Sequence, residues 1–138
     1  MSTITRRSRK QRGAAILESA LTLPIFLFFT FGLFDFSWVL FRHQVFVHQA
    51  QTAARYGAVN PSDLAGIKNM AIYNNPAGGT VGLFGLQPAN VTVTRNGQGT
   101  TADRIVVTIS NVVFNFVSPG RSGNFTGHPI TAVANVEN

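Results

Sequence analysis

The sequence predicts an α+β protein, in which a long N-terminal α-helix carries a small antiparallel β-sheet domain. Three observations support this fold class. A basic leader abuts an apolar run from Ala14 to Phe34, helical spacing of apolar residues continues to Gly57, and apolar and polar residues alternate in segments after Asn90. The 138 residues leave room for one small domain besides this helix. The predicted divisions are a leader at 1–13, a helix at 14–57 with its first half transmembrane, and a domain at 58–138.

The charge distribution is a topology signal rather than the footprint of a nucleic-acid-binding surface. The formal net charge is +6. Five basic residues, however, stand within the first twelve positions: Arg6, Arg7, Arg9, Lys10 and Arg12. Without residues 1–13, six basic residues face five acidic ones, so little basic excess remains for nucleic acid. Cysteine is absent, which excludes a disulfide framework and thiolate metal sites.

The leader at residues 1–13 is polar and has nothing to bury, so we expect it to be disordered. Its basic residues precede the apolar run, whereas only Arg42 lies close behind that run. By the positive-inside bias, the N-terminus is cytoplasmic and the C-terminal domain is exported. A removed secretory signal is the competing interpretation, but the apolar run is longer than such signals and the helical pattern continues through Trp38 and Phe41.

The predicted span from Ala14 to Phe34 carries a single charge, Glu18. A helix of that length rises about 30 Å, enough to cross the hydrocarbon core of a bilayer. An ionised carboxylate there costs up to about 3 kcal/mol at mid-helix. If the chain is cut after Gly13, the new amine of Ala14 lies on the same helical face as Glu18 and each can neutralise the other. Pro24 removes a helix hydrogen bond, so we expect a kink.

The outer end of the span carries Gly32, Asp35 and the interfacial aromatic Trp38. Asp35 has two interpretations: solvation by lipid headgroups, or an ion pair with a cation on a neighbouring subunit. Arg42 is a second candidate for a partner contact. Beyond it an amphipathic extension continues to Gly57, which we expect to end the helix as its C-cap.

The elements of the C-terminal domain follow in order. Asp63 is a candidate N-cap for a helix over roughly 63–73, and residues 78–85 form a glycine-rich loop without the Gly-Lys-Ser/Thr ending of a phosphate loop. Asn96-Gly97 is a turn signal that predicts an antiparallel hairpin. The remaining predictions are strands at 90–96 and 105–110, an extension or a separate strand at 111–117, a loop at 118–127 and a last strand at 130–136.

The sequence offers no converging set of catalytic or metal-binding groups. No serine has a neighbouring base pattern. His43 and His48 are five residues apart, so they do not share a helix face as a four-residue pair would. The carboxylates beyond the span are scattered along the chain, at Asp35, Asp63, Asp103 and Glu137. We therefore expect no enzyme activity, no cofactor and no metal.

The start of the long helix resembles a known family. The basic leader, Gly13, the small residues Ala14 and Ala15, and Glu18 at the fifth position after the glycine are similar to the processing site of type IV prepilins, which a prepilin peptidase cleaves. The wider run resembles the TadE-like pilins of the tight adherence (Flp, type IVb pilus) system. The residues that carry this wider resemblance are Arg12, Ala20-Leu21, Leu23-Pro24, Phe31-Gly32, Asp35-Phe36, Gln49, Ala53-Ala54-Arg55 and Gly57. Ser19 departs from the aromatic that often follows the glutamate, which favours a minor pilin or pseudopilin over the major subunit.

The resemblance implies a pilin-like fold and a structural function. Cleavage would separate Gly13 from Ala14, Glu18 would serve assembly, and the mature protein would take part in assembly or initiation of a Flp-type pilus used for surface adherence. The implied partners are the prepilin peptidase, other minor and major Flp pilins and the inner-membrane assembly platform. The implied location is the bacterial inner membrane, as a single-pass protein, or the pilus itself. The alternatives are a pseudopilin of a secretion or competence system and an uncleaved single-pass protein with a small ligand-binding domain.

Overall fold

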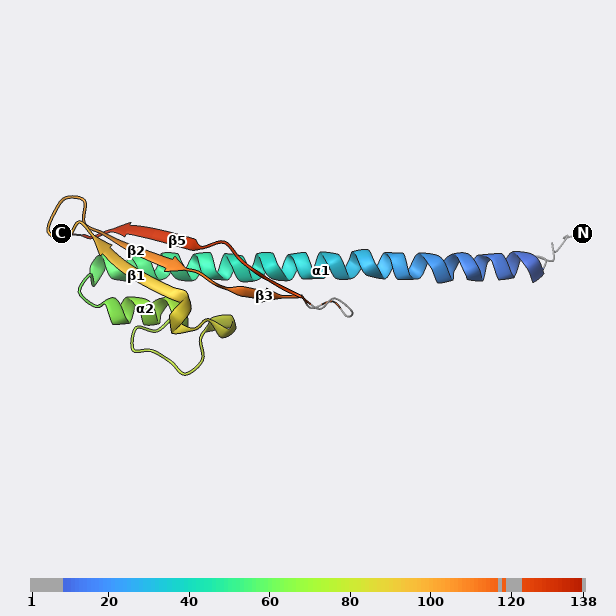
Figure 1. The fold of residues 1–138 in the computed structure, drawn as a ribbon, viewed down its shortest axis with the longest axis horizontal. Helices are drawn as coiled ribbons and strands as arrows, with labels where there is room; N and C mark the ends of the chain where they lie inside the picture. Colours follow the sequence, from blue (N-terminus) through green and yellow to red (C-terminus); the bar gives the residue numbers. More distant parts are fainter. Residues whose placement is uncertain (1–8, 117, 119–122, 138) are drawn as a thin grey trace, which may run out of the picture.

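The computed structural model describes residues 9–116, 118 and 123–137. Its helices are α1 (Arg9–Val59), α2 (Leu64–Tyr73) and the 3-10 turns η1 (Leu83–Gly85) and η2 (Pro88–Asn90). Its strands are β1 (Val91–Asn96), β2 (Arg104–Ile109), β3 (Val113–Asn115), β4 (Asn124–Thr126) and β5 (Ile130–Asn135). The predicted α+β class is confirmed, with a long helix followed by a small antiparallel domain (Figure 1). Residues 1–8 of the predicted leader, with Arg6 and Arg7, lie outside the described residues.

α1 runs as one rod through both predicted halves of the N-terminal helix (Figure 1). It begins at Arg9, so residues 9–13 are helical, and the prediction of disorder is wrong for them. Arginine, lysine and glutamine are strong helix formers, which lets the helix extend into the leader. Pro24 lies inside the helix, which continues on both sides of it. A local bend at Pro24 stays a prediction.

Four hydroxyl side chains in the N-terminal half of α1 find acceptors in the backbone of the same helix. Ser19, Thr22, Thr30 and Ser37 each donate to the carbonyl oxygen four residues earlier, at 2.8 to 2.9 Å. Such bonds remove the penalty of an unpaired hydroxyl in an apolar environment. These polar residues are therefore compatible with a helix surrounded by lipid.

Gly57 lies inside α1, and the prediction that it ends the helix is wrong. The helix ends at Val59. A Cβ on Gly57 would stand 2.9 Å from Ile105 Cγ2 and 2.9 Å from Ile67 Cδ1, closer than real Cβ contacts. Glycine is therefore required here by the close approach of α2 and the sheet to α1, and not by a change in backbone direction.

α2 confirms the predicted helix over 63–73 and its N-cap. Asp63 accepts a hydrogen bond from the amide of Gly66 at 2.8 Å through Oδ1, and from the hydroxyl of Tyr56 at 3.1 Å through Oδ2. Burial and the bond to Asp63 both raise the pKa of Tyr56. Asn74 takes the left-handed conformation with φ 55° and ends the helix. Asp63, the N-cap residue, thus also ties the start of α2 to α1.

The three-stranded sheet has the order β1-β2-β5 and is antiparallel throughout. The predicted hairpin is confirmed as β1 and β2, with Val93 opposite Val107. The predicted last strand is confirmed as β5, which pairs with β2. Just past β5, the amide of Glu137 donates to the carbonyl of Ala58 at 3.2 Å. The end of the described chain therefore returns to the end of α1.

A second sheet pairs β3 with β4. β3 matches the alternative that residues 111–117 contain a separate strand. β4 lies within 118–127, so the prediction of a loop is wrong for residues 124–126. The Phe114 and Phe125 rings stack across this pair with centroids 5.1 Å apart, which stabilises a short strand flanked by glycine and proline.

The core lies between one face of α1, α2 and the three-stranded sheet. α1 contributes Phe46 and then the small residues Ala50, Ala53 and Ala54, all buried. The larger buried side chains that pack against them come from α2 and β2: Ile67, Ile72, Ile105, Val107 and Ile109. The C-terminal half of α1 is therefore part of the domain core, although the domain predicted from the sequence begins only at residue 58.

Candidate functional site

The predicted processing site lies near the start of α1. Gly13 and Ala14 are both exposed, and no atom lies within 4 Å of the position that a Cβ on Gly13 would take. Because helix ends fray, the peptide bond between these residues can leave the helix at low cost. No described side chain outside this helix covers the bond.

Glu18 is exposed one helical turn after Ala14, so the structure keeps the two positions on neighbouring turns of one face. The backbone carbonyl of Glu18 accepts the hydroxyl of Thr22 at 2.8 Å. Its carboxylate forms no ion pair with any described side chain. No described side chain therefore compensates the charge of Glu18.

Large apolar side chains cover most of the N-terminal half of α1. They remain exposed from Ile16 to Phe41, and Phe28 keeps 72 % of its surface accessible. The stretch from Gly13 to Val59 contains a segment long and apolar enough to cross a membrane, and none of that segment is buried in the described structure. This single candidate helix near the N-terminus fits a single-pass membrane protein.

The same part of the chain is similar to known proteins. Residues 13–55 match the family model described as TadE-like protein. This segment is TadE-like. The match confirms the resemblance seen in the sequence and associates the chain with the machinery of the Tad pilus. No curated protein matches the chain, and no solved structure matches it either.

Asp35 of the TadE-like segment is buried, with 5 % of its surface exposed, so the interpretation of solvation by headgroups is wrong. Its Oδ1 accepts a hydrogen bond from the amide of Ser118 at 3.0 Å, and its Oδ2 accepts one from the Ser118 hydroxyl. These bonds join positions 83 residues apart in sequence. Asp35 therefore holds the segment after β3 against α1, while an ion pair with a neighbouring subunit stays a prediction.

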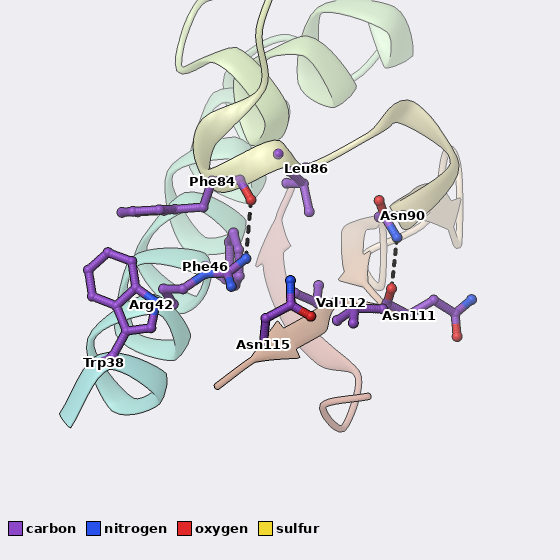
Figure 2. A pocket seen from close by; sticks show the side chains of 11 residues that line it. Trp38, Arg42, Phe46, Phe84, Leu86, Asn90, Asn111, Val112 and Asn115 are labelled. Carbon is purple, nitrogen blue, oxygen red and sulfur yellow. Dashed lines mark hydrogen bonds between the residues drawn. The ribbon is translucent and has the colours of Figure 1, made fainter. Parts of the chain in front are cut away.

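Arg42 of the TadE-like segment points into a pocket between α1, η1 and β3 (Figure 2). Its Nη2 donates to the carbonyl of Phe84 at 3.1 Å. The guanidinium also lies over the rings of Phe46, Phe84 and Phe114, with its carbon 5.8, 5.7 and 5.1 Å from the ring centroids. Arg42 thus contacts its own domain, and the predicted contact with a partner stays a prediction.

The domain-facing residues of the TadE-like segment follow a helical repeat. Asp35, Val39, Arg42 and Phe46 are separated by four, three and four residues, which places them along one face of α1. The sequence identifies Asp35 and Arg42 as candidates for contact with a partner protein, but it does not reveal the residues of their own chain that they contact. Ser118 and Phe84 lie in irregular segments with no motif that indicates such contacts.

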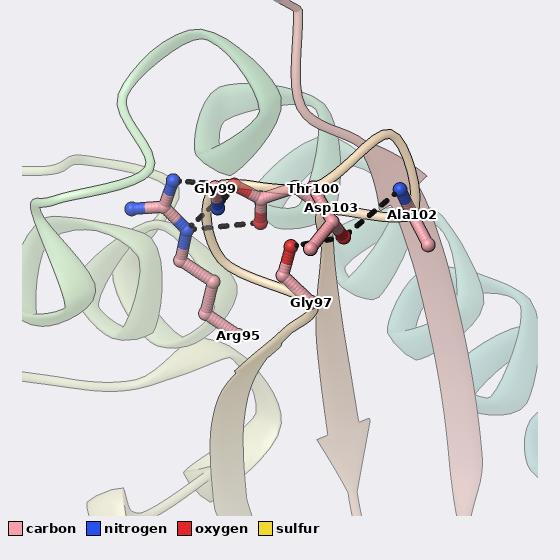
Figure 3. A network of polar contacts seen from close by, with 6 residues as sticks. All are labelled: Arg95, Gly97, Gly99, Thr100, Ala102 and Asp103. Carbon is pink, nitrogen blue, oxygen red and sulfur yellow. Dashed lines mark hydrogen bonds and ion pairs between the residues drawn. The ribbon is translucent and has the colours of Figure 1, made fainter.

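A separate polar cluster closes the loop between β1 and β2 (Figure 3). Arg95 and Asp103 form an ion pair with Nη2 2.5 Å from Oδ2, and Arg95 Nε donates to Oδ1 at 3.0 Å. Hydrogen bonding to Arg95 lowers the pKa of Asp103, and the amide of Gly99 adds to the effect. The same pairing raises the pKa of Arg95. Only the Asn96-Gly97 turn signal pointed to this loop.

The remaining titratable residues do not gather into a reactive site. The described residues contain no group of three or more His, Asp or Glu side chains that could hold a metal ion. His43 and His48 both lie on α1, five residues apart. The chemistry that this arrangement supports is recognition and packing along α1.

Proposed function

We propose that the protein is a minor pilin or pseudopilin of the Tad pilus, cut after Gly13 and incorporated through α1 into a pilus assembly or its initiation complex. The observation that carries this proposal is the TadE-like match, which begins at Gly13 and continues to Arg55. The exposure of Gly13 and Ala14 supports access by a prepilin peptidase. The role is structural, and the covalent step is performed on this chain rather than by it.

The two ends of α1 take different parts in this proposal. The N-terminal half offers exposed apolar side chains to lipid before assembly and to neighbouring pilin helices afterwards. The carboxylate of Glu18 pairs with the new amine of Ala14 in the same chain or in a neighbour, which reduces the cost of both charges in an apolar layer. The basic leader keeps the N-terminus on the cytoplasmic side of the inner membrane, and the domain is exported.

The cleavage step is tested by the N-terminal sequence and intact mass of the membrane-purified protein from cells with and without the matching prepilin peptidase. The expected result is a start at Ala14 that depends on the peptidase. Gly13→Val should block cleavage, because a branched side chain hinders approach to the backbone. Gly32→Val is the matched control, since Gly32 also has no atom within 4 Å of a Cβ but lies far from the cleavage site. An unprocessed N-terminus in cells with active peptidase contradicts the proposal.

The assembly step is tested separately with Glu18→Gln. This variant should still be cut after Gly13, but it should co-purify less with other pilins, because the charge that pairs with the new amine is gone. Ser19→Ala is the control, as the Ser19 hydroxyl bonds only to the carbonyl of Ala15 in its own helix. Normal pilus assembly by the Glu18 variant would exclude this role.

A further inference from the structure

The pocket around Arg42 lies where the domain meets the exposed part of α1. It has a volume of about 550 Å³ and is lined on the α1 side by Trp38, Arg42 and Phe46. Phe84 closes it from η1, and Asn115 faces it from β3 (Figure 2). No carboxylate is among the lining residues, so the guanidinium gives the pocket a net positive charge.

The hydrogen-bonding capacity of Arg42 is only partly used by the described residues. A guanidinium carries five N–H donors. Nη2 reaches the carbonyl of Phe84, whereas Nε is buried without an acceptor. The aromatic rings around the guanidinium contribute their π faces but no strong acceptor. An anion with several oxygens would supply acceptors to the guanidinium where it lines the pocket, and arginine suits phosphate in particular.

The position of this pocket along α1 fits the level of a membrane surface. The exposed large apolar residues of α1 from Ile16 to Phe41 extend over about 39 Å, close to the thickness of a bilayer with its headgroups. Arg42 is the next residue. Its guanidinium lies over the ring of Phe46, one turn farther along α1, and Trp38, an aromatic of the type found at membrane interfaces, lines the same pocket.

An apolar groove adjoins the charged pocket on its membrane side. It is lined by Phe34, Ser37, Trp38 and Phe41, and it shares Trp38 with the Arg42 pocket. A cationic pocket next to an apolar groove matches the two parts of a phospholipid, whose phosphate and acyl chain are joined through glycerol. A free phosphate or a carboxylate of a protein partner would occupy only the cationic pocket and would leave the apolar groove empty.

We propose that Arg42 and its pocket bind the phosphate of an anionic phospholipid, with an acyl chain along the Phe34–Phe41 groove. A headgroup without an ammonium fits best, because the pocket offers no carboxylate and its ring faces are already occupied by the guanidinium. The amide of Asn115 is placed to hydrogen-bond a hydroxylated headgroup. This inference rests on the proposed membrane insertion of α1.

Trp38 makes a direct test possible, because it is the only tryptophan in the chain. The full chain is reconstituted in bilayers that contain phosphatidylglycerol or phosphatidylcholine with brominated acyl chains, which quench tryptophan fluorescence on contact. At equal mole fractions, brominated phosphatidylglycerol should quench Trp38 more strongly. Arg42→Gln should reduce this preference about fivefold, which corresponds to roughly 1 kcal/mol for one arginine near the surface. Arg42→Lys should retain part of it.

Arg55→Gln is the matched control, because Arg55 is an exposed arginine on the same helix and lies outside the pocket. It should leave the preference unchanged. Equal quenching by both lipids in the unmodified chain overturns the lipid site, as does a preference that survives Arg42→Gln or that falls equally in both variants. Loss of the preference on adding inorganic phosphate would identify a free-phosphate site instead. No quenching by either lipid would show that α1 is not inserted, which contradicts the proposed membrane insertion as well.

Discussion

The N-terminal half of α1, residues 16–41, and its buried face within residues 46–58 are both apolar, but they differ in the size of their side chains. The first region exposes leucine, isoleucine and phenylalanine along its length, and only its end, at Asp35 and Val39, faces the domain. The second buries Phe46, Gln49 and otherwise alanine and glycine against the domain. Large side chains suit a surface covered by flexible lipid, whereas small ones allow a folded sheet to approach the helix backbone. The contrast shows that side-chain volume, and not hydrophobicity alone, separates the two halves.

The largest loss of stability expected from this contrast follows substitution of Phe46, which is fully buried. Phe46→Ala should destabilise the domain by about 3–5 kcal/mol, through lost transfer energy and a cavity. The measurement is denaturant unfolding of the full chain in detergent. Phe28→Ala, at a residue that is 72 % exposed, should leave domain stability unchanged. Similar losses for both variants would mean that the two halves are not energetically distinct.

The next effect concerns Asp35, the polar residue of the exposed half that contacts the domain. Asp35→Ala removes both hydrogen bonds to Ser118, and a hydrogen bond to a charged group contributes about 1.5–3 kcal/mol. The Ser118 amide should then exchange its proton faster with solvent. Ser37→Ala is the control, because that hydroxyl bonds only to its own helix. Unchanged exchange at Ser118 in the Asp35 variant contradicts the described contact.

A smaller effect, which differs between the two halves, is expected for two glycines of α1. Gly57→Ala gains about 1 kcal/mol of helix propensity but introduces the contacts with Ile105 and Ile67, and overpacking costs about 1–3 kcal/mol. The net result should be a loss of roughly 1 kcal/mol in the same unfolding assay. Gly32→Ala meets open space and should cause no loss. A Gly57 variant more stable than the parent would refute the close packing.

The smallest effect is a pH dependence located far from the exposed half, at Asp103. The pKa of Asp103 is lowered in the folded state by Arg95, so this pair stabilises the fold above the ordinary carboxyl pKa. That stabilisation is lost as the pH falls below about 4 and passes through the lowered pKa. Unfolding midpoints measured across this window should fall for the parent chain and change less for Asp103→Asn. If the unfolding midpoints of the parent chain and of Asp103→Asn changed equally with pH, the ion pair of Asp103 would not contribute to stability.

Local patterns were sufficient to predict much of the fold. The length of the apolar run, the cap at Asp63 and the alternation around Asn96-Gly97 depend on residues close together in sequence, and each led to a confirmed element. The TadE-like match likewise lies within one continuous segment, residues 13–55. Features whose physical cause is confined to neighbouring residues are therefore evident from the amino-acid sequence alone.

Except for the disorder predicted at residues 9–13, the predictions that failed depend on contacts between distant residues. Gly57 has the sequence signature of a helix end, and only the approach of Ile105 shows that it serves packing. The strand β4 depends on Phe114 across the sheet, and the burial of Asp35 depends on Ser118. Arg42 similarly gave no indication that Phe84 and Phe114 would surround it. No spacing rule in the sequence connects these pairs.

The hydrogen bond from Glu137 to Ala58 has a consequence for distance along the molecule. It fixes the end of the described chain beside the end of α1, while Arg9 stands at the opposite end of that helix (Figure 1). With 51 residues, α1 is about 75 Å long. The helix thus separates the two ends of the chain, so a fluorophore at Glu137 and one placed just after Ala14 lie at opposite ends of the molecule, and a change in their energy transfer measures bending of α1.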